Sequence, residues 1–131
     1  MMKQLFLWII QASIEEWDAL INCLGGRNIA GDKMKEKGTG HWNSPNTSAT
    51  NESEFTALPG GLRSYIRDNS SIIEDGLKGM YAYFWSATEP HENCAKKIIL
   101  IDRSSEALGD DSMPYGGSEA LDGYSVRCIK D

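Results

Sequence analysis

The run of small polar residues from position 38 to position 63, GTGHWNSPNTSATNESEFTALPGGLR, limits the fold more than any other feature of this 131-residue chain. A stretch so poor in apolar residues is typical of disordered chain. Here Trp42, Phe55, Leu58 and a Pro59-Gly60-Gly61 turn interrupt it at places where ordered loops are anchored. We therefore predict a long, ordered loop that delivers Phe55 and Leu58 into a hydrophobic core.

One amphipathic helix is expected before this loop. Ser13 and Glu16 form a capping box, and the helix then runs to about Cys23. Its apolar stripe consists of Ile14, Trp17, Leu20, Ile21 and Leu24. The Gly25-Gly26 pair tolerates the left-handed backbone that ends a helix.

A second, shorter helix is expected from Ile29 or Ala30 to about Lys37, with Gly38 as its stop. Ala30 and Met34 should face the core. The charged residues should lie mostly outside; they are Asp32, Lys33, Lys35, Glu36 and Lys37.

Strands are expected in the rest of the chain. The strongest candidates are Tyr81 to Ser86 and Lys97 to Asp102, which are rich in aromatic and β-branched residues. Three weaker strand candidates follow from the same reasoning. They are a short buried strand over 55–58, a strand or irregular edge over 62–66, and a strand over 124–129 whose side chains alternate between the two faces of the sheet. Asp68 to Ser71 reads as a turn with Ile72-Ile73 as an apolar anchor behind it, and Asp110 to Gly117 as a loop. Helices followed by a small twisted, mostly antiparallel sheet indicate an α+β fold.

The first twelve residues, MMKQLFLWIIQA, can be read in two ways. The apolar run is too short to span a membrane and resembles a weak signal-peptide core. A buried strand at the start of the fold is the reading that we favour, because aromatic and β-branched residues suit a sheet.

Length and charge limit the class of protein. A chain of 131 residues suits a single domain over residues 1–131. The formal net charge of −6 argues against a nucleic-acid partner, which would need a clustered basic surface.

No set of residues indicates an enzyme. The three cysteines, Cys23, Cys94 and Cys128, lack the spacing of a zinc site, and their odd number leaves at least one unpaired within the chain. His41 and His91 lie in expected loops without a nucleophile motif nearby, so we expect no catalytic residues.

A ligand site is the more serious option. Calcium takes oxygen ligands from loops, and the candidates are Asn43, Asn46, Asn51, Glu52, Glu54 and Glu89, with Asp110 and Asp111 as a separate pair. We favour the alternative that these side chains fix loop turns.

A sugar-stacking platform could combine Trp42, Tyr83 and Trp85. For Trp85 we favour packing in the core. For Trp42, in a polar loop, both readings stand. Arg63 and Arg127, each flanked by apolar positions, are expected to be structural.

Three segments carry a resemblance to a known family. Trp85-Ser86-Ala87-Thr88-Glu89 resembles a WSSTE element, and the ending from Tyr124 to Asp131 resembles GFSVRCVRD. The stretch Ile14 to Leu20 followed by Leu24-Gly25-Gly26 resembles a helix that opens with a DAEW-like motif and ends with LGG. These are motifs of the Fibrobacter succinogenes major paralogous domain, found in surface and secreted proteins of Fibrobacter and Bacteroidetes.

The resemblance covers residues 13–131 and departs from the family at two places. Residues 1–12 stand where the family carries a Cys-Pro-x-Gly-Trp-His-like opening, so the start looks truncated or divergent. The stretch between Cys94 and Gly123 also diverges. In the family the cysteine at the position of Cys128 pairs with one in the opening, which implies that Cys128 is a free buried thiol here or pairs with Cys23 or Cys94.

The resemblance implies a C-type-lectin-like fold related to the sulfatase-modifying-factor group. We therefore expect a non-enzymatic, secreted or cell-surface module that binds a glycan or a protein, with Trp42, Asn43, Asn46, Asn51 and Glu89 as the candidate ligand-binding residues. A calcium ion would be an additional cofactor, with Asn51, Glu52, Glu54 and Glu89 as its candidate ligands. The first alternative is a purely structural or protein-interaction domain. The second is an enzyme remnant, which requires a cleft with a cysteine or His41 beside a carboxylate.

Overall fold

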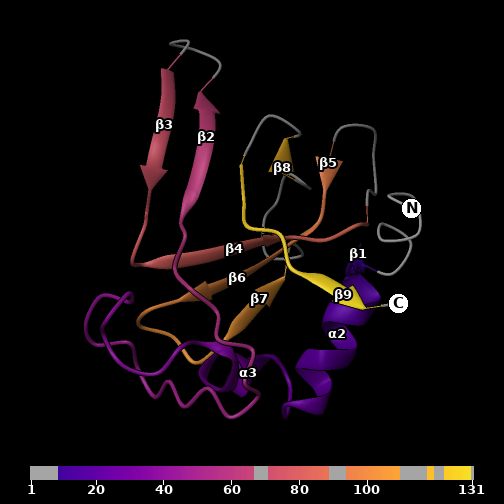
Figure 1. Cartoon of the computed structure of the whole chain (residues 1–131), viewed down its shortest axis with the longest axis vertical. Coiled ribbons are helices and arrows are strands. Elements are labelled where there is room, and N and C mark those ends of the chain that lie inside the picture. The colour runs from indigo at the N-terminus through magenta and orange to yellow at the C-terminus, as the bar shows by residue number, and fades with distance from the viewer. Residues whose placement is uncertain (1–8, 67–70, 89–93, 110–117, 120–122, 131) are drawn as a thin grey trace.

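The helices precede most of the strands and pack on one side of a small sheet (Figure 1). A computed structural model describes residues 9–66, 71–88, 94–109, 118–119 and 123–130. Its helices are α2 (Ile14–Cys23) and α3 (Arg27–Met34). Its strands are β1 (Ile9–Gln11), β2 (Leu62–Ile66), β3 (Ser71–Gly76), β4 (Tyr81–Trp85), β5 (Cys94–Ala95), β6 (Lys97–Ile101), β7 (Ala107–Gly109), β8 (Ser118–Glu119) and β9 (Cys128–Lys130). The α+β class is confirmed.

Helix α2 follows its local signals. The Ser13 hydroxyl accepts a hydrogen bond from the Glu16 amide at 3.2 Å, and the Glu16 carboxylate accepts one from the Ser13 amide at 3.1 Å. This completes the predicted capping box. Gly25 and Gly26, with φ of 104° and 99°, end the helix as predicted. The buried residues of the stripe are Ile14, Trp17 and Ile21, while Leu20 and Leu24 pack against the core from its edge.

Helix α3 differs from its prediction at both ends, since it begins at Arg27 and ends at Met34. The early end has a tertiary cause. The carbonyl of Met34 and the amide of Glu36 bond to the backbone of Ala57, at 2.9 Å and 3.1 Å. This pairing draws Lys35 into an extended backbone, φ −66° and ψ 141°, and turns its side chain into the interior. Lys35 is therefore an exception to the expectation that the charged residues of this segment lie mostly outside.

The central sheet has the order β4-β6-β7 and is antiparallel throughout. The two strongest strand predictions, β4 and β6, are confirmed and pair directly from Tyr81↔Ile101 to Trp85↔Lys97. Side chains alternate along a strand, so one face of the sheet meets the helices. That face supplies Ala82, Phe84, Ile98, Leu100 and Ala107 to the core.

The long loop is ordered, as predicted, but it meets the core differently. Phe55 packs on Trp17 and Phe84, with ring centroids 5.7 Å and 5.6 Å away. Leu58, in contrast, is 46% exposed. The expected strand 55–58 is absent, and Ala57 alone makes a bridge, to Lys35. Ala57 occupies the core position that we had assigned to Leu58.

Two chain segments share the edge of β4 that faces away from β6. Gly61 bridges Ala82, Ser125 bridges Phe84, and the two segments bridge each other through Arg63 and Gly123. The predicted strand 124–129 is therefore correct only for its last part, since β9 begins at Cys128. Residues 110–117 and most of the turn 68–71 lie outside the described residues.

The hairpin β2–β3 stands away from the body (Figure 1). Strand β2 agrees with the prediction of a strand or irregular edge over 62–66. Ile72-Ile73 was expected only as an apolar anchor behind a turn, but it lies within strand β3.

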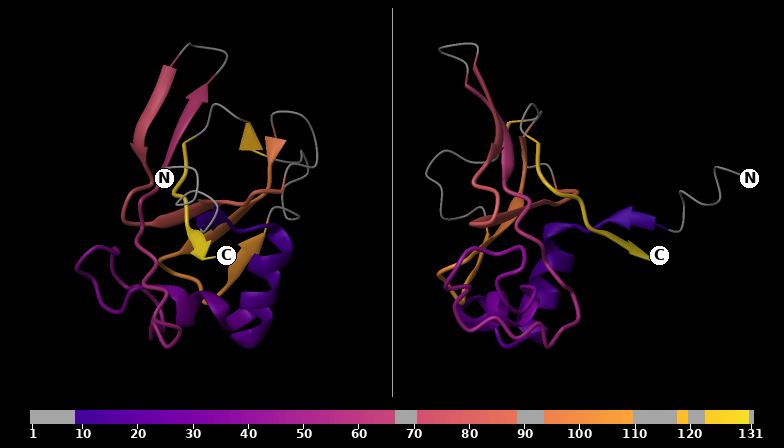
Figure 2. Two further views of the ribbon diagram at one scale, coloured as in Figure 1. Left: turned by 45° about the vertical axis from the view of Figure 1, so that its right-hand side comes forward. Right: turned by 60° about the vertical axis from the view of Figure 1, so that its left-hand side comes forward.

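The start of the described chain pairs with its end. Strand β1 runs antiparallel to β9, with Gln11 opposite Cys128, and the right-hand view of Figure 2 shows the two side by side. The strand reading of the opening segment is confirmed for Ile9–Gln11. Neither helix of the described part is long and apolar enough to cross a membrane.

Candidate functional site

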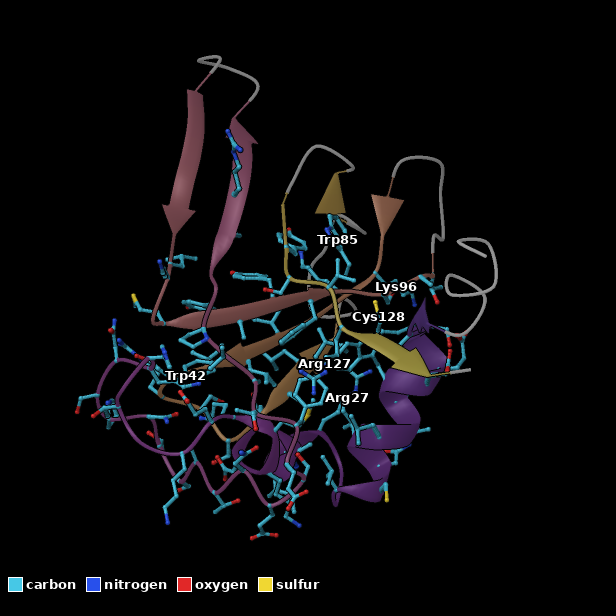
Figure 3. All side chains as sticks on the ribbon, in the orientation of Figure 1. Arg27, Trp42, Trp85, Lys96, Arg127 and Cys128 are labelled. Carbon is cyan, nitrogen blue, oxygen red and sulfur yellow. The ribbon has the colours of Figure 1, made fainter. Side chains whose placement is uncertain are left out.

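Trp42, the leading candidate from the sequence, belongs to the core. Its side chain is 1% exposed, and its indole nitrogen donates to the Ala57 carbonyl at 2.9 Å. Trp42 and Trp85 lie on opposite sides of β4 (Figure 3). A buried ring cannot stack on a sugar, so the ligand-binding role expected for Trp42 was wrong.

The loop asparagines bond mainly to the loop itself. Asn46 is buried and its amide donates to the carbonyls of Glu36 and Gly38. The two amide atoms of Asn51 bond to the hydroxyl and the amide of Thr56, at 2.9 Å and 2.8 Å. Both asparagines have positive φ, 44° and 53°, which asparagine tolerates better than most residues. The turn-fixing alternative is confirmed for Asn46 and Asn51.

The remaining calcium candidates are not gathered into a site. Glu52 lies 4.0 Å from the Lys33 ammonium, Glu54 points to solvent, and Asn43 is exposed beside Gly79. Glu89 lies outside the described residues, as do Asp110 and Asp111. Within the described ranges, no three His, Cys, Asp or Glu side chains are placed to hold a metal ion.

The candidate catalytic groups of the described residues do not line a cleft. His41 Nδ1 is 2.8 Å from a Glu36 carboxylate oxygen, but its side chain is 62% exposed. Cys23 and Cys128 are both free and exposed. Of the alternatives given for Cys128, the free thiol is therefore observed, but it is not buried. His91 lies outside the described residues.

Four aromatic rings form a continuous row on the face of the central sheet that points away from the helices. We call Tyr81, Tyr83, Tyr124 and Trp85, in this order, the aromatic row. Successive ring centroids lie 5.7 Å, 5.1 Å and 4.3 Å apart. Alternation along β4 places Tyr81, Tyr83 and Trp85 on one face, and Tyr124 arrives from the neighbouring segment. Tyr83 is 9% exposed and forms the floor, whereas the other three rings are half-buried.

A buried lysine packs beside the aromatic row, and burial affects the tyrosine at its floor. Lys97, opposite Trp85 on β6, is 8% exposed and places its ammonium 5.7 Å from the centroid of Tyr124. Burial raises the pKa of Tyr83, and the nearby Tyr81 hydroxyl acts in the same direction. The Tyr83 hydroxyl therefore stays protonated at neutral pH and can donate as well as accept a hydrogen bond.

A cleft of about 350 Å³ adjoins the aromatic row where the two segments on the edge of β4 diverge. Its walls are Gly60, Gly61, Leu62 and Arg63 on one side and Gly123, Tyr124 and Ser125 on the other. The Ser125 amide donates to the Tyr83 carbonyl at 2.9 Å, which fixes this wall to β4. Because Tyr124 belongs to both structures, the aromatic row and the cleft form one surface, which we call the candidate site.

The model of the Fibrobacter succinogenes major domain family matches residues 8–130. The chain belongs to the Fibrobacter succinogenes major domain family. Neither the curated proteins nor the solved structures that were compared gave a match. The family match begins upstream of residue 13, so it includes the whole antiparallel pair of β1 and β9 as well as the helices and the central sheet.

The geometry revises the platform expected from the sequence. The platform expected from the sequence consisted of Trp42, Tyr83 and Trp85. The aromatic row contains Tyr83 and Trp85, lacks Trp42, and includes Tyr81 and Tyr124 in addition. The aromatic alternation of 81–85 could have indicated Tyr81. Tyr124 carried no such signal, because its position depends on pairing between segments about forty residues apart in the chain.

Proposed function

We propose that this member of the Fibrobacter succinogenes major domain family is a non-enzymatic module that binds linear glycan chains at the candidate site. The supporting observation is the half-buried aromatic row beside a polar, glycine-walled cleft. Ligand sites commonly combine aromatic walls with a few polar groups, and the cleft volume lies near the lower end of the usual range of roughly 300–1,000 Å³.

The chemistry of a sugar fits both parts of this surface. Its C–H faces pack on aromatic rings, and its hydroxyls need hydrogen-bond partners when they lose water. Tyrosine hydroxyls on the row, with Ser125 and Arg63 at the cleft, are groups of that kind. Tyr81, Tyr83 and Trp85 follow one another along β4. A chain of several sugar units laid along β4 would meet more of this row than a single sugar would.

The absence of catalysis is part of the proposal. Among the described residues, His41 pairs with Glu36 in the long loop, and no hydrogen bond joins it to Cys23 or Cys128. The His41–Glu36 pair does not line the cleft. An enzyme remnant would be supported instead if hydrolysis or oxidation of a bound glycan depended on His41.

The test is a binding screen of the purified protein against linear plant, bacterial and mucin glycans, in calcium and again in EDTA. We expect saturable binding in both conditions, with affinity that rises from monosaccharide to oligosaccharide and then levels off. Trp85→Ala and Tyr124→Ala should each abolish it. His41→Ala, on the exposed loop, is the control and should bind as the wild type does. Absence of binding to every glycan, or binding that both aromatic variants retain, would contradict the proposal.

A second candidate is a protein-interaction role, which the projecting hairpin favours (Figure 2). In the described chain β3 pairs with β2 on one side only, and an open strand edge can accept an extended partner. Replacing residues 64–74 by a short turn should then abolish self-association or partner binding in sedimentation experiments while leaving glycan binding intact.

A C-type-lectin-like arrangement and a secreted or cell-surface location complete the proposal, both implied by the family resemblance. An experimental structure tests the former, and fractionation of the native cells tests the latter.

A further inference from the structure

Lys35 is a charged residue in the interior of the protein. Its side chain is fully buried, at 0% exposure, directly after the last residue of α3. A buried ammonium is costly unless it is paired and hydrogen-bonded. The surroundings of Lys35 therefore indicate what it does.

Three backbone carbonyls converge on the Lys35 ammonium. The nitrogen donates to Thr47 O at 3.2 Å, Ile101 O at 3.0 Å and Ser104 O at 2.9 Å. These oxygens can only accept hydrogen bonds. An ammonium has three N–H donors, whereas a neutral amine has two. The three contacts therefore require the charged form.

Two carboxylates surround the same group. Asp32 Oδ1 lies 4.0 Å from the Lys35 nitrogen, and Asp102 is 1% exposed. Each has a buried oxygen without a hydrogen-bond partner, Asp32 Oδ1 and Asp102 Oδ2, while Arg103 donates to the other Asp102 oxygen. Burial lowers the pKa of Lys35, and the charges of Asp32 and Asp102 act in the opposite direction. The Trp42 ring lies 5.8 Å from the ammonium and adds a cation–π contact.

Carbonyl and carboxylate oxygens on loops are the ligands that proteins offer to hard cations. We infer that the oxygens around Lys35 form a cation site whose occupant is the Lys35 ammonium, which ties the long loop to the central sheet in place of a metal ion. The tie joins α3 to the loop at Thr47 and to the end of β6 at Ile101 and Ser104. It is independent of glycan binding and explains how a loop without regular structure stays ordered.

The first test compares Lys35→Met with Lys33→Met. Lys33 is the matched control, because it is a lysine two positions earlier, in the last turn of α3, and pairs with Glu52 at the surface. Lys35→Met should lower Tm by roughly 10 °C or more, because it leaves carboxylates buried without a cation. It should also expose residues 38–61 to limited proteolysis, whereas Lys33→Met should change Tm by no more than about 2 °C. EDTA should change neither property of the wild type. A Lys35→Met protein with wild-type Tm and a protected loop would overturn the inference.

The second test asks whether the oxygens accept another cation. Lys35→Ala leaves a cavity among them, so ammonium or potassium chloride should raise its Tm relative to tetramethylammonium chloride at equal ionic strength. The wild type and Lys33→Ala should show no such difference. An equal response of all three proteins would show that the oxygens do not form a cation site.

A measurement on the wild type covers the case in which both Lys35 variants fail to fold. Nitrogen-15 NMR should show a slowly exchanging NH₃⁺ signal for the Lys35 side chain at neutral pH. The signal of Lys33, which is partly exposed, should exchange rapidly. Rapid exchange at Lys35 would contradict the inference.

Discussion

Trp42 and Trp85 have the same side chain but opposite surroundings. Trp42 is enclosed by the core and bonded to Ala57, whereas Trp85 is half-buried against Tyr124 at a centroid distance of 4.3 Å. Trp42 was the leading ligand candidate with a core role left open, and the core role is the one observed. Trp85 was favoured for the core but is half-buried. Whether an aromatic residue lies in the core or at the surface depends on which face of β4 it packs against. Its neighbours in the sequence do not specify that face.

Trp42→Ala should therefore destabilise the protein. Loss of a fully buried Trp costs about 3–5 kcal/mol in the free energy of unfolding, and Ala57 would also lose the donor to its carbonyl. Urea denaturation measures the change. Trp85→Ala is the comparison and should cost clearly less, because its ring is only half-buried. A loss below about 1 kcal/mol for Trp42→Ala would show that its ring is not a core residue.

The exposed thiols give a second prediction at the residue scale. Cys23 and Cys128 are free and exposed, at the end of α2 and the start of β9. Both should be alkylated by iodoacetamide in the folded protein, without denaturant, because modification needs an accessible thiol. Peptide mass spectrometry identifies the modified residues. Protection of either cysteine in the monomer would contradict the assignment.

Helix α3 lies unusually close to the chain that leads into β7. A Cβ at Gly31 would meet the carbonyl oxygen of Glu106, with that of Ser105 at 2.8 Å. Gly31 is therefore a contact residue, and the absence of a side chain sets how closely the helix approaches β7.

Gly31→Ala should destabilise the protein even though alanine is the better helix former. In an exposed helix this exchange gains about 1 kcal/mol, whereas here backbone atoms must move, at a cost of roughly 1–3 kcal/mol. Gly40→Ala is the control, because nothing lies within 4 Å of its added Cβ. Thermal unfolding of both variants gives the comparison. A Gly31→Ala protein more stable than the wild type would refute the close approach.

At the scale of the whole molecule, the central sheet separates the hydrophobic core from the aromatic row. One face carries the core with α2 and α3, and the other carries the aromatic row. Arg127 completes the core side by placing its guanidinium 4.4 Å from the centroid of Phe55 (Figure 3). A contact of this kind agrees with the structural role expected for Arg127.

The raised pKa of Tyr83 predicts how global stability changes at alkaline pH. A group with a raised pKa in the fold contributes stability below its ordinary value, here 10.0, and loses it as the pH rises through the folded value. The stability difference between wild type and Tyr83→Phe should therefore shrink above pH 10.0. Lys35 is present in both proteins and cancels in this difference. Urea denaturation across this pH range measures it, and a constant difference would contradict the burial of the hydroxyl.

Local signals determined several elements without help from the rest of the chain. The capping box, apolar stripe and glycine pair predicted α2 to within its observed bounds. Alternating aromatic and β-branched residues predicted β4 and β6. The anchored polar loop was also predicted, because turn-forming side chains bond to nearby backbone groups.

Contacts between distant segments decided the rest. The carbonyls that accept hydrogen bonds from the Lys35 ammonium lie up to 69 positions away in the sequence. The burial of Lys35 could therefore not be inferred from the charged residues next to it. Ala57 replaced Leu58 in the core because it pairs with the chain after α3. The aromatic row exists because the segment at Tyr124 joins the edge of β4. The sequence thus determined the elements and the loop between them. The tertiary structure decided which side chains entered the core, which residue tied the loop to the sheet and which rings lay at the surface, because those roles arise only where remote segments meet.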